Sequence, residues 1–363
     1  MIRTRPALDV MPEYVPGRSA ESVAARYAIG DVIKLASNEV PFGPLPAALA
    51  AIEAAARSAN RYPDDAATAL REALGASCGV EPEAVLLGNG SVELCRMALA
   101  ATCDPGDEVV FGRPSFEAYP VLAQQVGATM VQVPLTTAHR YDLDAMADVV
   151  TDRTRLVFVC NPNNPTGTTV SRDDAERFLD RLPRDVLVVF DEAYREFVTT
   201  LDFPDGLALL RDHENVAVLR TFSKAYGLAA LRVGYAIARV DVIGALRKVR
   251  VPFATNAVAQ VAALASLGAH DEMRARVAGV VAERRRVFDA LADLGLEVIA
   301  SEANFLWLPL GEHAAVLGEY SERAGVVLRP FPDLGVRITI GTPDENDRLL
   351  KVLRAAQEDG AAG

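Results

Sequence analysis

Short apolar runs alternate with longer amphipathic or alanine-rich stretches, and this alternation is the feature that most limits the fold of the chain. Each run has the length of a strand and each intervening stretch has the length of a helix. This pattern is typical of parallel strands joined by crossover helices. Seven such runs occur, at residues 84–88, 108–111, 129–133, 155–160, 186–190, 216–220 and 233–237. We therefore predict an α/β fold with a mostly parallel seven-stranded sheet sandwiched by helices.

Two flanking regions depart from this alternation. Residues 1–45 are rich in proline and glycine, which interrupt long helices, so we expect an extended arm that leads into the start of a small domain. Residues 46–255 hold the seven runs and form the predicted large domain. Residues 256–363 combine long helical segments with short apolar runs, and we predict that they form a small α+β domain.

Charge and composition narrow the classes of function. The formal net charge of -12 disfavours a nucleic-acid partner, because phosphate backbones are bound through a surplus of lysine and arginine. A small-molecule substrate is the better expectation. No stretch approaches the ~20 apolar residues of a membrane span, and the first residues lack a signal-peptide core. The cysteines and histidines lack metal-ligand spacing. We expect a cytoplasmic protein without a metal site or membrane contact.

The segment around Lys224 carries the strongest chemical signal. Thr221 and Ser223 precede this lysine, and Arg232 follows it eight residues later between apolar residues. A lone lysine after a strand is most often a solvated charge. An arginine among apolar residues is costly, however, unless it meets an anion. A bound phosphate would explain the arginine, the two hydroxyl groups and the lysine together.

The same segment carries a family resemblance. Its wording at residues 221–228, Thr-Phe-Ser-Lys-Ala-Tyr-Gly-Leu, resembles the Schiff-base signature of fold-type I pyridoxal-phosphate aminotransferases, in particular the histidinol-phosphate aminotransferase family. The resemblance spans nearly the whole chain and implies that pyridoxal 5'-phosphate is the cofactor. It also implies that Lys224 is the catalytic residue that binds the cofactor covalently and moves protons. Thr221, Ser223 and Arg232 would hold the cofactor phosphate.

A strand that ends abruptly in an acidic residue adds support. The apolar run at residues 186–190 is followed by Asp191, which could simply cap the next segment. In an open parallel sheet, however, ligands bind beyond the carboxyl ends of the strands. A carboxylate there would keep the pyridine nitrogen of the cofactor protonated. By resemblance, Tyr194 contacts the ring hydroxyl of the cofactor.

Three further segments match cofactor motifs of the family. Residues 161–167, Asn-Pro-Asn-Asn-Pro-Thr-Gly, could form an ordinary turn, but the whole heptad matches the family pattern, in which Asn164 hydrogen-bonds the ring oxygen. Gly90 and Ser91 lie in a glycine-rich turn before a helix, which offers backbone N–H groups to an anion, and they align with the phosphate loop of the family. Phe116 aligns with the ring that stacks on the pyridine, although a core phenylalanine is the alternative.

Other positions are assigned mainly by resemblance. Tyr62 matches a tyrosine that reaches the phosphate in the neighbouring subunit, which predicts a homodimer. Arg337 lies alone in a strand pattern, and guanidinium geometry suits a bidentate contact with the substrate carboxylate. Asn38 resembles the residue near that carboxylate in the segment that closes over the substrate.

The predicted substrate depends on a few short sequence segments. Arg329 and Arg337 occur in both the histidinol-phosphate and the aromatic branches of the family. Residues 38–46, 115–120 and 303–309 most resemble the aromatic amino acid aminotransferase branch, and their apolar side chains suit a phenyl or phenol ring. We predict transfer between phenylalanine, tyrosine or tryptophan and 2-oxoglutarate. The alternative is histidinol phosphate as amino donor, for which Arg329 would supply a second cation.

Two other classes of protein share part of these motifs. A pyridoxal-phosphate decarboxylase or C–S lyase would use the same cofactor frame, because that frame does not fix which bond breaks. A carboxylate-binding Arg337 favours transamination over decarboxylation. A cofactor-responsive regulator would carry a helix-turn-helix module before the core, whereas a proline-rich arm precedes the core here.

Overall fold

The computed structural model describes residues 2, 4, 11 and 17–362. Much of the predicted N-terminal arm, namely residues 1, 3, 5–10 and 12–16, therefore lies outside the described residues. Among the described residues, no helix is both long enough and apolar enough to cross a membrane.

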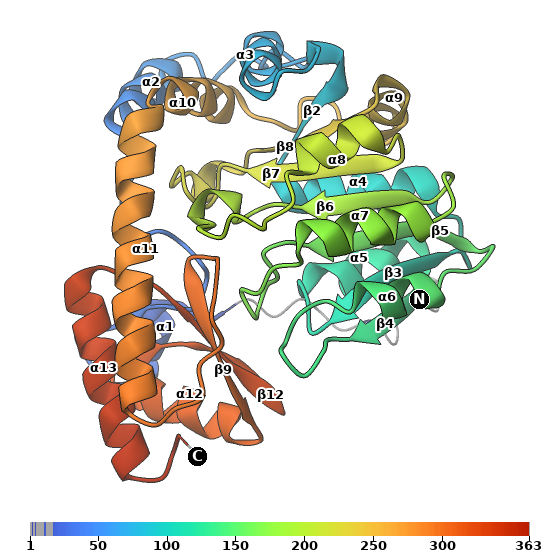
Figure 1. The fold of residues 1–363 in the computed structure, drawn as a ribbon. Coiled ribbons are helices and arrows are strands. Elements are labelled where there is room, and N and C mark those ends of the chain that lie inside the picture. The colour runs from blue at the N-terminus through green and yellow to red at the C-terminus, as the bar shows by residue number, and fades with distance from the viewer. Residues whose placement is uncertain (1, 3, 5–10, 12–16, 363) are drawn as a thin grey trace.

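A seven-stranded sheet forms the centre of the molecule, with strand order β2-β8-β7-β6-β5-β3-β4 (Figure 1). Only β8 runs antiparallel to its neighbours. The predicted α/β fold with a mostly parallel seven-stranded sheet is confirmed. The strands are β2 (Val85–Gly88), β3 (Glu108–Arg113), β4 (Thr129–Pro134), β5 (Thr154–Cys160), β6 (Leu187–Asp191), β7 (Val216–Thr221) and β8 (Gly234–Ala238).

Helices cover both faces of this sheet, which is why its central strands are mostly apolar. One layer contains α4 (Ser91–Thr102), α5 (Ala118–Val126) and α9 (Val240–Lys248). The other layer contains α6 (Leu143–Asp148), α7 (Arg172–Arg181) and α8 (Gly206–Asp212). Short 3-10 helices η2 (Pro82–Ala84), η3 (Arg195–Phe197) and η4 (Ala229–Leu231) lie in the connections.

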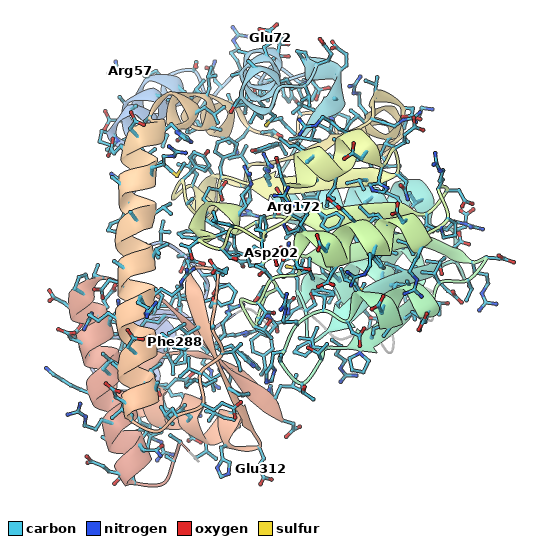
Figure 2. The ribbon with its side chains drawn as sticks, in the orientation of Figure 1. Arg57, Glu72, Arg172, Asp202, Phe288 and Glu312 are labelled. Carbon is cyan, nitrogen blue, oxygen red and sulfur yellow. The ribbon has the colours of Figure 1, made fainter. Side chains whose placement is uncertain are left out.

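A second, three-stranded antiparallel sheet has the order β11-β12-β9 and lies beside the first (Figure 1). Its strands are β9 (Phe305–Gly311), β11 (Arg329–Phe331) and β12 (Leu334–Thr339). Helices α11 (His270–Asp293), α12 (His313–Arg323) and α13 (Pro343–Glu358) pack around it. Side chains fill the space between the two sheets, whereas polar side chains such as Arg57, Glu72 and Glu312 point outward (Figure 2).

Three helices pack together at one end of the long α11: α2 (Pro46–Ala56), α3 (Thr68–Cys78) and α10 (Ala257–Gly268). Helix α10 follows the predicted boundary at residue 255, yet it packs on α2 and α3 of the predicted large domain. The division into domains at that residue stays a prediction.

The described part of the N-terminal arm is not wholly extended, in contrast to the sequence expectation. It contains helix α1 (Ala20–Tyr27), where the Ser19 hydroxyl accepts a hydrogen bond from the Ser22 N–H at 3.1 Å. Val23 of this helix is buried against Ala36 and Val327. The capped first turn and the burial of Val23 thus stabilise a short helix. The proline and glycine content of this region had led us to expect an extended arm instead.

The arm then joins the C-terminal part of the chain. Strand β1 (Ile33–Lys34) pairs in parallel with β10 (Val326–Val327). The N-terminal segment that leads to Asn38 is therefore fixed by residues almost 300 positions later in the chain.

The core beneath the carboxyl ends of β5 and β6 rests on stacked aromatic rings. The Phe158 ring is fully buried and stacks on the Tyr119 ring, with centroids 4.4 Å apart. The Tyr119 hydroxyl in turn donates to Asp191 Oδ2 at 3.0 Å.

We expect Phe158→Ala to lower the free energy of unfolding by about 3–5 kcal/mol, because it removes buried ring contacts and leaves a cavity. Urea unfolding followed by circular dichroism measures this loss. Leu201→Ala is the control, because Leu201 is 96% exposed and its loss should cost less than about 0.5 kcal/mol. Equal unfolding midpoints for the two variants would contradict the assigned packing.

Candidate active site

A cavity lies where the carboxyl ends of β5, β6 and β7 meet at one edge of the large sheet. The parallel strands bring together segments that follow different parts of the sequence. Most predicted cofactor-binding residues line it, together with three residues that the sequence did not single out. The lining residues are Ser91, Val92, Phe116, Cys160, Asn164, Asp191, Ala193, Tyr194, Thr221, Ser223, Lys224 and Arg232.

Asp191, the last residue of β6, is buried in this cavity with one oxygen atom in need of a donor. Its Oδ2 accepts a hydrogen bond from Tyr119, whereas its Oδ1 is buried without a hydrogen-bond partner. Burial raises the pKa of the Asp191 carboxyl to about 6. A protonated ring nitrogen would supply the missing donor and stabilise the carboxylate.

Lys224 offers an amine that is neutral over an unusual pH range. Burial, together with the positive charge of Arg337, lowers the pKa of the Lys224 amine to about 7. Its Nζ atom lies 3.4 Å from the Ser37 carbonyl oxygen and 5.6 Å from the centre of the Tyr194 ring. With this pKa the amine is neutral in about half of the molecules near pH 7, and the neutral form can act as a nucleophile and as a proton acceptor.

Donors for an anion gather at the N-terminus of α4. Gly90 precedes this helix with a φ of 81°, and a Cβ atom there would lie 2.2 Å from Arg232 Nη2. Only glycine therefore leaves room for the guanidinium group at this position. Arg232 Nη1 donates to Ser223 Oγ at 3.3 Å, and Ser91 begins the helix. Thr221 completes the hydroxyl groups of this corner, which has the chemistry of a phosphate site.

Polar contacts join the N-terminal segment to both sheets beside the cavity. Asn38 Nδ2 donates to the Tyr194 hydroxyl at 2.9 Å, and Thr339 Oγ1 donates to Asn38 Oδ1 at 3.1 Å. Arg337 donates to the Asn164 side-chain oxygen and to the Ala36 carbonyl oxygen. Burial raises the pKa of the Tyr194 hydroxyl, so this group stays protonated and can donate a hydrogen bond.

Five predicted site residues are not among those that line the cavity: Asn38, Tyr62, Gly90, Arg329 and Arg337. Asn38 and Arg337 form hydrogen bonds with lining residues, and Gly90 adjoins Arg232. Arg329 instead forms an ion pair with Glu117 at 2.7 Å. Tyr62 is 83% exposed, and its ring lies 4.7 Å from that of Phe253.

Tyr119, the hydrogen-bond donor to Asp191, was not among the site residues predicted from the sequence. Phe116 lies three residues earlier, just before α5, and its ring packs edge-on against Tyr119, with centroids 5.4 Å apart. No local pattern marked Tyr119 as this donor. Phe116 itself lines the cavity, as a residue that stacks on a bound ring must.

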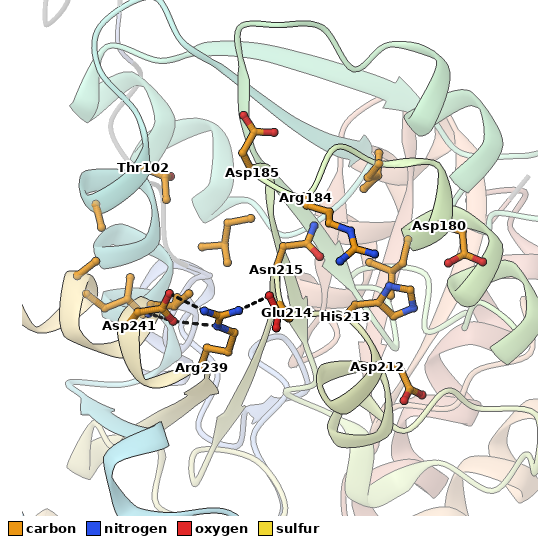
Figure 3. A pocket seen from close by; sticks show the side chains of 17 residues that line it. Thr102, Asp180, Arg184, Asp185, Asp212, His213, Glu214, Asn215, Arg239 and Asp241 are labelled. Atoms are coloured by element: carbon orange, nitrogen blue, oxygen red, sulfur yellow. Dashed lines mark hydrogen bonds and ion pairs between the residues drawn. The ribbon is translucent and has the colours of Figure 1, made fainter.

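A larger pocket lies at the opposite edge of the large sheet, where β6 and β7 begin (Figure 3). Arg239 in this pocket pairs with both Glu214 and Asp241. In the part of the chain that the structure describes, no buried side-chain atom that lacks a hydrogen-bond partner belongs to this pocket. The Lys224 cavity is therefore the better candidate for chemistry.

Most of the chain is similar to known aminotransferases. The model of the family described as aminotransferase class I and II matches residues 30–353. An aromatic amino acid aminotransferase of Rhodococcus jostii (strain RHA1) is 55% identical over 348 residues, which cover 96% of this chain and 94% of the relative. An aromatic amino acid aminotransferase of Streptomyces coelicolor is 53% identical over 351 residues, which cover 96% of each chain.

The fold is also similar to that of a solved aminotransferase structure. The crystal structure of histidinol-phosphate aminotransferase from Sinorhizobium meliloti in complex with pyridoxal-5'-phosphate superposes with a TM-score of 0.91 and 27% sequence identity. The superposition covers 99% of this chain and 98% of that chain.

We expect Lys224 in the cofactor-free protein to react with trinitrobenzenesulfonate with a midpoint near pH 7, because its amine is protonated below its lowered pKa and neutral above it. Peptide mass mapping after timed labelling measures the rate at this lysine. Exposed lysines in the same sample serve as the control and should show midpoints near 10.4. A Lys224 midpoint close to theirs would contradict the assigned environment.

Proposed function

The chain belongs to the class I and II aminotransferases, and from this we propose that it transfers amino groups between aromatic amino acids and 2-oxoglutarate with pyridoxal 5'-phosphate as cofactor. One observation carries the proposal: the Lys224 amine, the unpaired Asp191 oxygen and the phosphate corner at Arg232 line a single cavity. This arrangement matches the three ends of a phosphorylated pyridine aldehyde.

The residues of the cavity fit this cofactor, and we propose a role for each of them. Pyridoxal 5'-phosphate, when bound, supplies a ring that accepts electrons from the substrate α-carbon. Asp191 keeps the ring nitrogen protonated, and Phe116 packs on the ring face. The ring oxygen is bound by Asn164 and Tyr194. The phosphate is held by Gly90, Ser91, Thr221, Ser223 and Arg232.

Lys224 has two tasks in this proposal. Its amine would hold the cofactor covalently, and the neutral amine would accept the proton of the substrate α-carbon and later return it. A pKa of about 7 suits both tasks, because the amine must lose and regain a proton near neutral pH. Arg337 and Asn38 bind the substrate carboxylate beside this amine.

The aromatic substrate is supported by the relatives at 53–55% identity, which are aromatic amino acid aminotransferases. Aromatic rings next to the cavity also suit such a substrate: Phe305 packs edge-on against Tyr194, with centroids 5.1 Å apart. Histidinol phosphate is the second candidate, because a histidinol-phosphate aminotransferase has nearly the same fold.

A homodimer is also part of the proposal. Exposed apolar side chains surround the α2 and α10 helices, where a second subunit would bury them. They are Phe42, Leu49, Tyr62, Val251, Phe253 and Val261. In a dimer, Tyr62 would reach the phosphate corner of the partner subunit. A cytoplasmic location remains an expectation from the sequence.

We expect kcat/KM with 2-oxoglutarate to be higher for phenylalanine than for histidinol phosphate. Parallel steady-state measurements with both donors test the substrate. A preference of about a hundredfold or more for histidinol phosphate, ~2.7 kcal/mol of transition-state discrimination, would reverse the choice between the branches. Lys224→Ala is the control for the cofactor chemistry, and it should abolish turnover and the absorbance band of the covalently bound cofactor.

We expect sedimentation velocity to give a dimer at assay concentration. Tyr62→Ala should weaken cofactor binding, because it removes a contact to the phosphate across the interface. Leu201→Ala, a change at a 96% exposed side chain outside the proposed interface, should alter neither property. A fully active monomer would exclude a shared site.

A further inference from the structure

The surroundings of Asp191 favour a neutral carboxyl group. Its side chain is buried, and burial raises its pKa to about 6. Burial also raises the pKa of the neighbouring Cys95 and Cys160 thiols, which therefore stay neutral. The carboxylate of Glu192 raises the pKa of Asp191 further, whereas the positive charge of Lys224 lowers it. An ionised Asp191 in this place therefore depends on hydrogen-bond donors.

The Tyr119 hydroxyl group supplies such a donor. It donates to Asp191 Oδ2 at 3.0 Å, and this bond lowers the pKa of the carboxyl group more than the backbone N–H of Ala193 does. Burial raises the pKa of the Tyr119 hydroxyl well above its usual value, so the group keeps its proton. Asp191 Oδ1 has no hydrogen-bond partner. One oxygen of Asp191 is thus held by the chain, and the other is left for a ligand.

Aromatic packing holds the Tyr119 ring in one orientation. Tyr119 lies in the first turn of α5 and is fully buried, and its ring stacks on that of Phe158 with an interplanar angle of 7°. The rings of Phe111 and Phe116 pack edge-on against it, with centroids 5.8 and 5.4 Å away. Because β5 lies between β3 and β6, the ring reaches across β5 to the end of β6. A donor fixed in this way needs no rearrangement to stabilise a charge.

The bond between Tyr119 and Asp191 affects the position of one proton in the proposed function. A proton between Asp191 Oδ1 and the ring nitrogen of bound pyridoxal 5'-phosphate can stay on the nitrogen, beside a carboxylate, or move to Oδ1, beside a neutral ring. Burial favours the second arrangement, because it separates no charges. A hydrogen bond to Oδ2 favours the first, since it stabilises the carboxylate. The charged ring is the better acceptor of electrons from the substrate α-carbon.

We propose that Tyr119 is a positioning residue, whose hydroxyl group stabilises the Asp191 carboxylate and thereby keeps the ring nitrogen of the bound cofactor protonated. This inference rests on the proposed function and adds a residue that does not itself line the cavity. The competing explanation is a purely structural role, in which Tyr119 only fills the core between the sheet and α5.

The first measurement uses the cofactor-free protein. The infrared band of the protonated Asp191 carboxyl group, identified by its loss in Asp191→Asn, is followed against pH in the unaltered chain and in Tyr119→Phe. The midpoint of the unaltered chain should lie near 6. Tyr119→Phe keeps the ring and removes a donor to the charged form. Its carboxyl group should therefore bind the proton about tenfold more tightly, which raises the midpoint by about one pH unit.

The second measurement uses the holoenzyme with an isotopically labelled ring nitrogen, observed by NMR. In Tyr119→Phe the nitrogen resonance should move towards that of an unprotonated ring, and the first half-reaction with L-phenylalanine should slow about tenfold. A cofactor analogue with carbon in place of the ring nitrogen cannot carry this proton. With that analogue, the unaltered and altered proteins should react at rates within about twofold of each other.

Two further variants separate this role from a structural one. Tyr320→Phe removes a hydroxyl group that donates to Asp359 Oδ2 at 2.7 Å, outside the cavity lining, and it should change neither the midpoint nor the resonance. Tyr119→fluorotyrosine, with fluorine beside the hydroxyl group, keeps the packed ring and makes the hydroxyl a stronger donor. It should lower the Asp191 midpoint, and this opposite change is measurable even if Tyr119→Phe folds poorly.

The outcomes distinguish this inference from the function on which it rests. If Tyr119→Phe folds and changes the proton affinity of Asp191 by less than about threefold, or slows both cofactors equally, the role of Tyr119 is wrong and the proposed function stands. A raised midpoint with an unchanged nitrogen resonance also overturns that role. If the unaltered chain does not bind pyridoxal 5'-phosphate, the proposed function fails and the role of Tyr119 fails with it.

Discussion

A buried carboxylate is costly unless hydrogen-bond donors reach it, and the placement of Asp191 is the constraint around which this site is organised. The strand β6 carries it to the edge of the sheet, and Tyr119 supplies one donor from α5. The stack of Tyr119 on Phe158 fixes that donor against β5. The other oxygen is left for a ligand, so the stability of the core and the readiness to bind a cofactor depend on the same few contacts.

Residues of both sheets determine the pKa of the Lys224 amine. The lysine follows β7, but the charge that helps to lower its pKa comes from Arg337 on β12. The same arginine bonds to Asn164 after β5 and to Ala36 in the N-terminal segment. Two other parts of the chain therefore hold the arginine that helps to lower the pKa of the Lys224 amine, and a shift of the small sheet would change that pKa.

The sequence was most informative where local patterns decide structure. Continuous apolar runs predicted the seven strands, and the sequence around Lys224 predicted the family to which the chain belongs. Contacts between distant segments were beyond such patterns: Glu117 and Arg329 are 212 positions apart, and neither motif indicates the other. Helix α1 was missed because its support comes from burial of Val23 against Val327, which no local window contains. The positions of Tyr62 and Arg329 outside the cavity likewise depend on tertiary packing.

The pairing of β1 with β10 has a consequence for the order in which the protein is built. During synthesis the N-terminal segment emerges first, and the large sheet from β2 to β8 can assemble while the ribosome is still translating. Strand β1, which leads to Asn38, can pair with Val326 and Val327 only after those two residues have been synthesised. The nascent chain can therefore fold the large sheet, together with Lys224, before the segment with Asn38 is held in place, and that segment is fixed only after β10 has been translated.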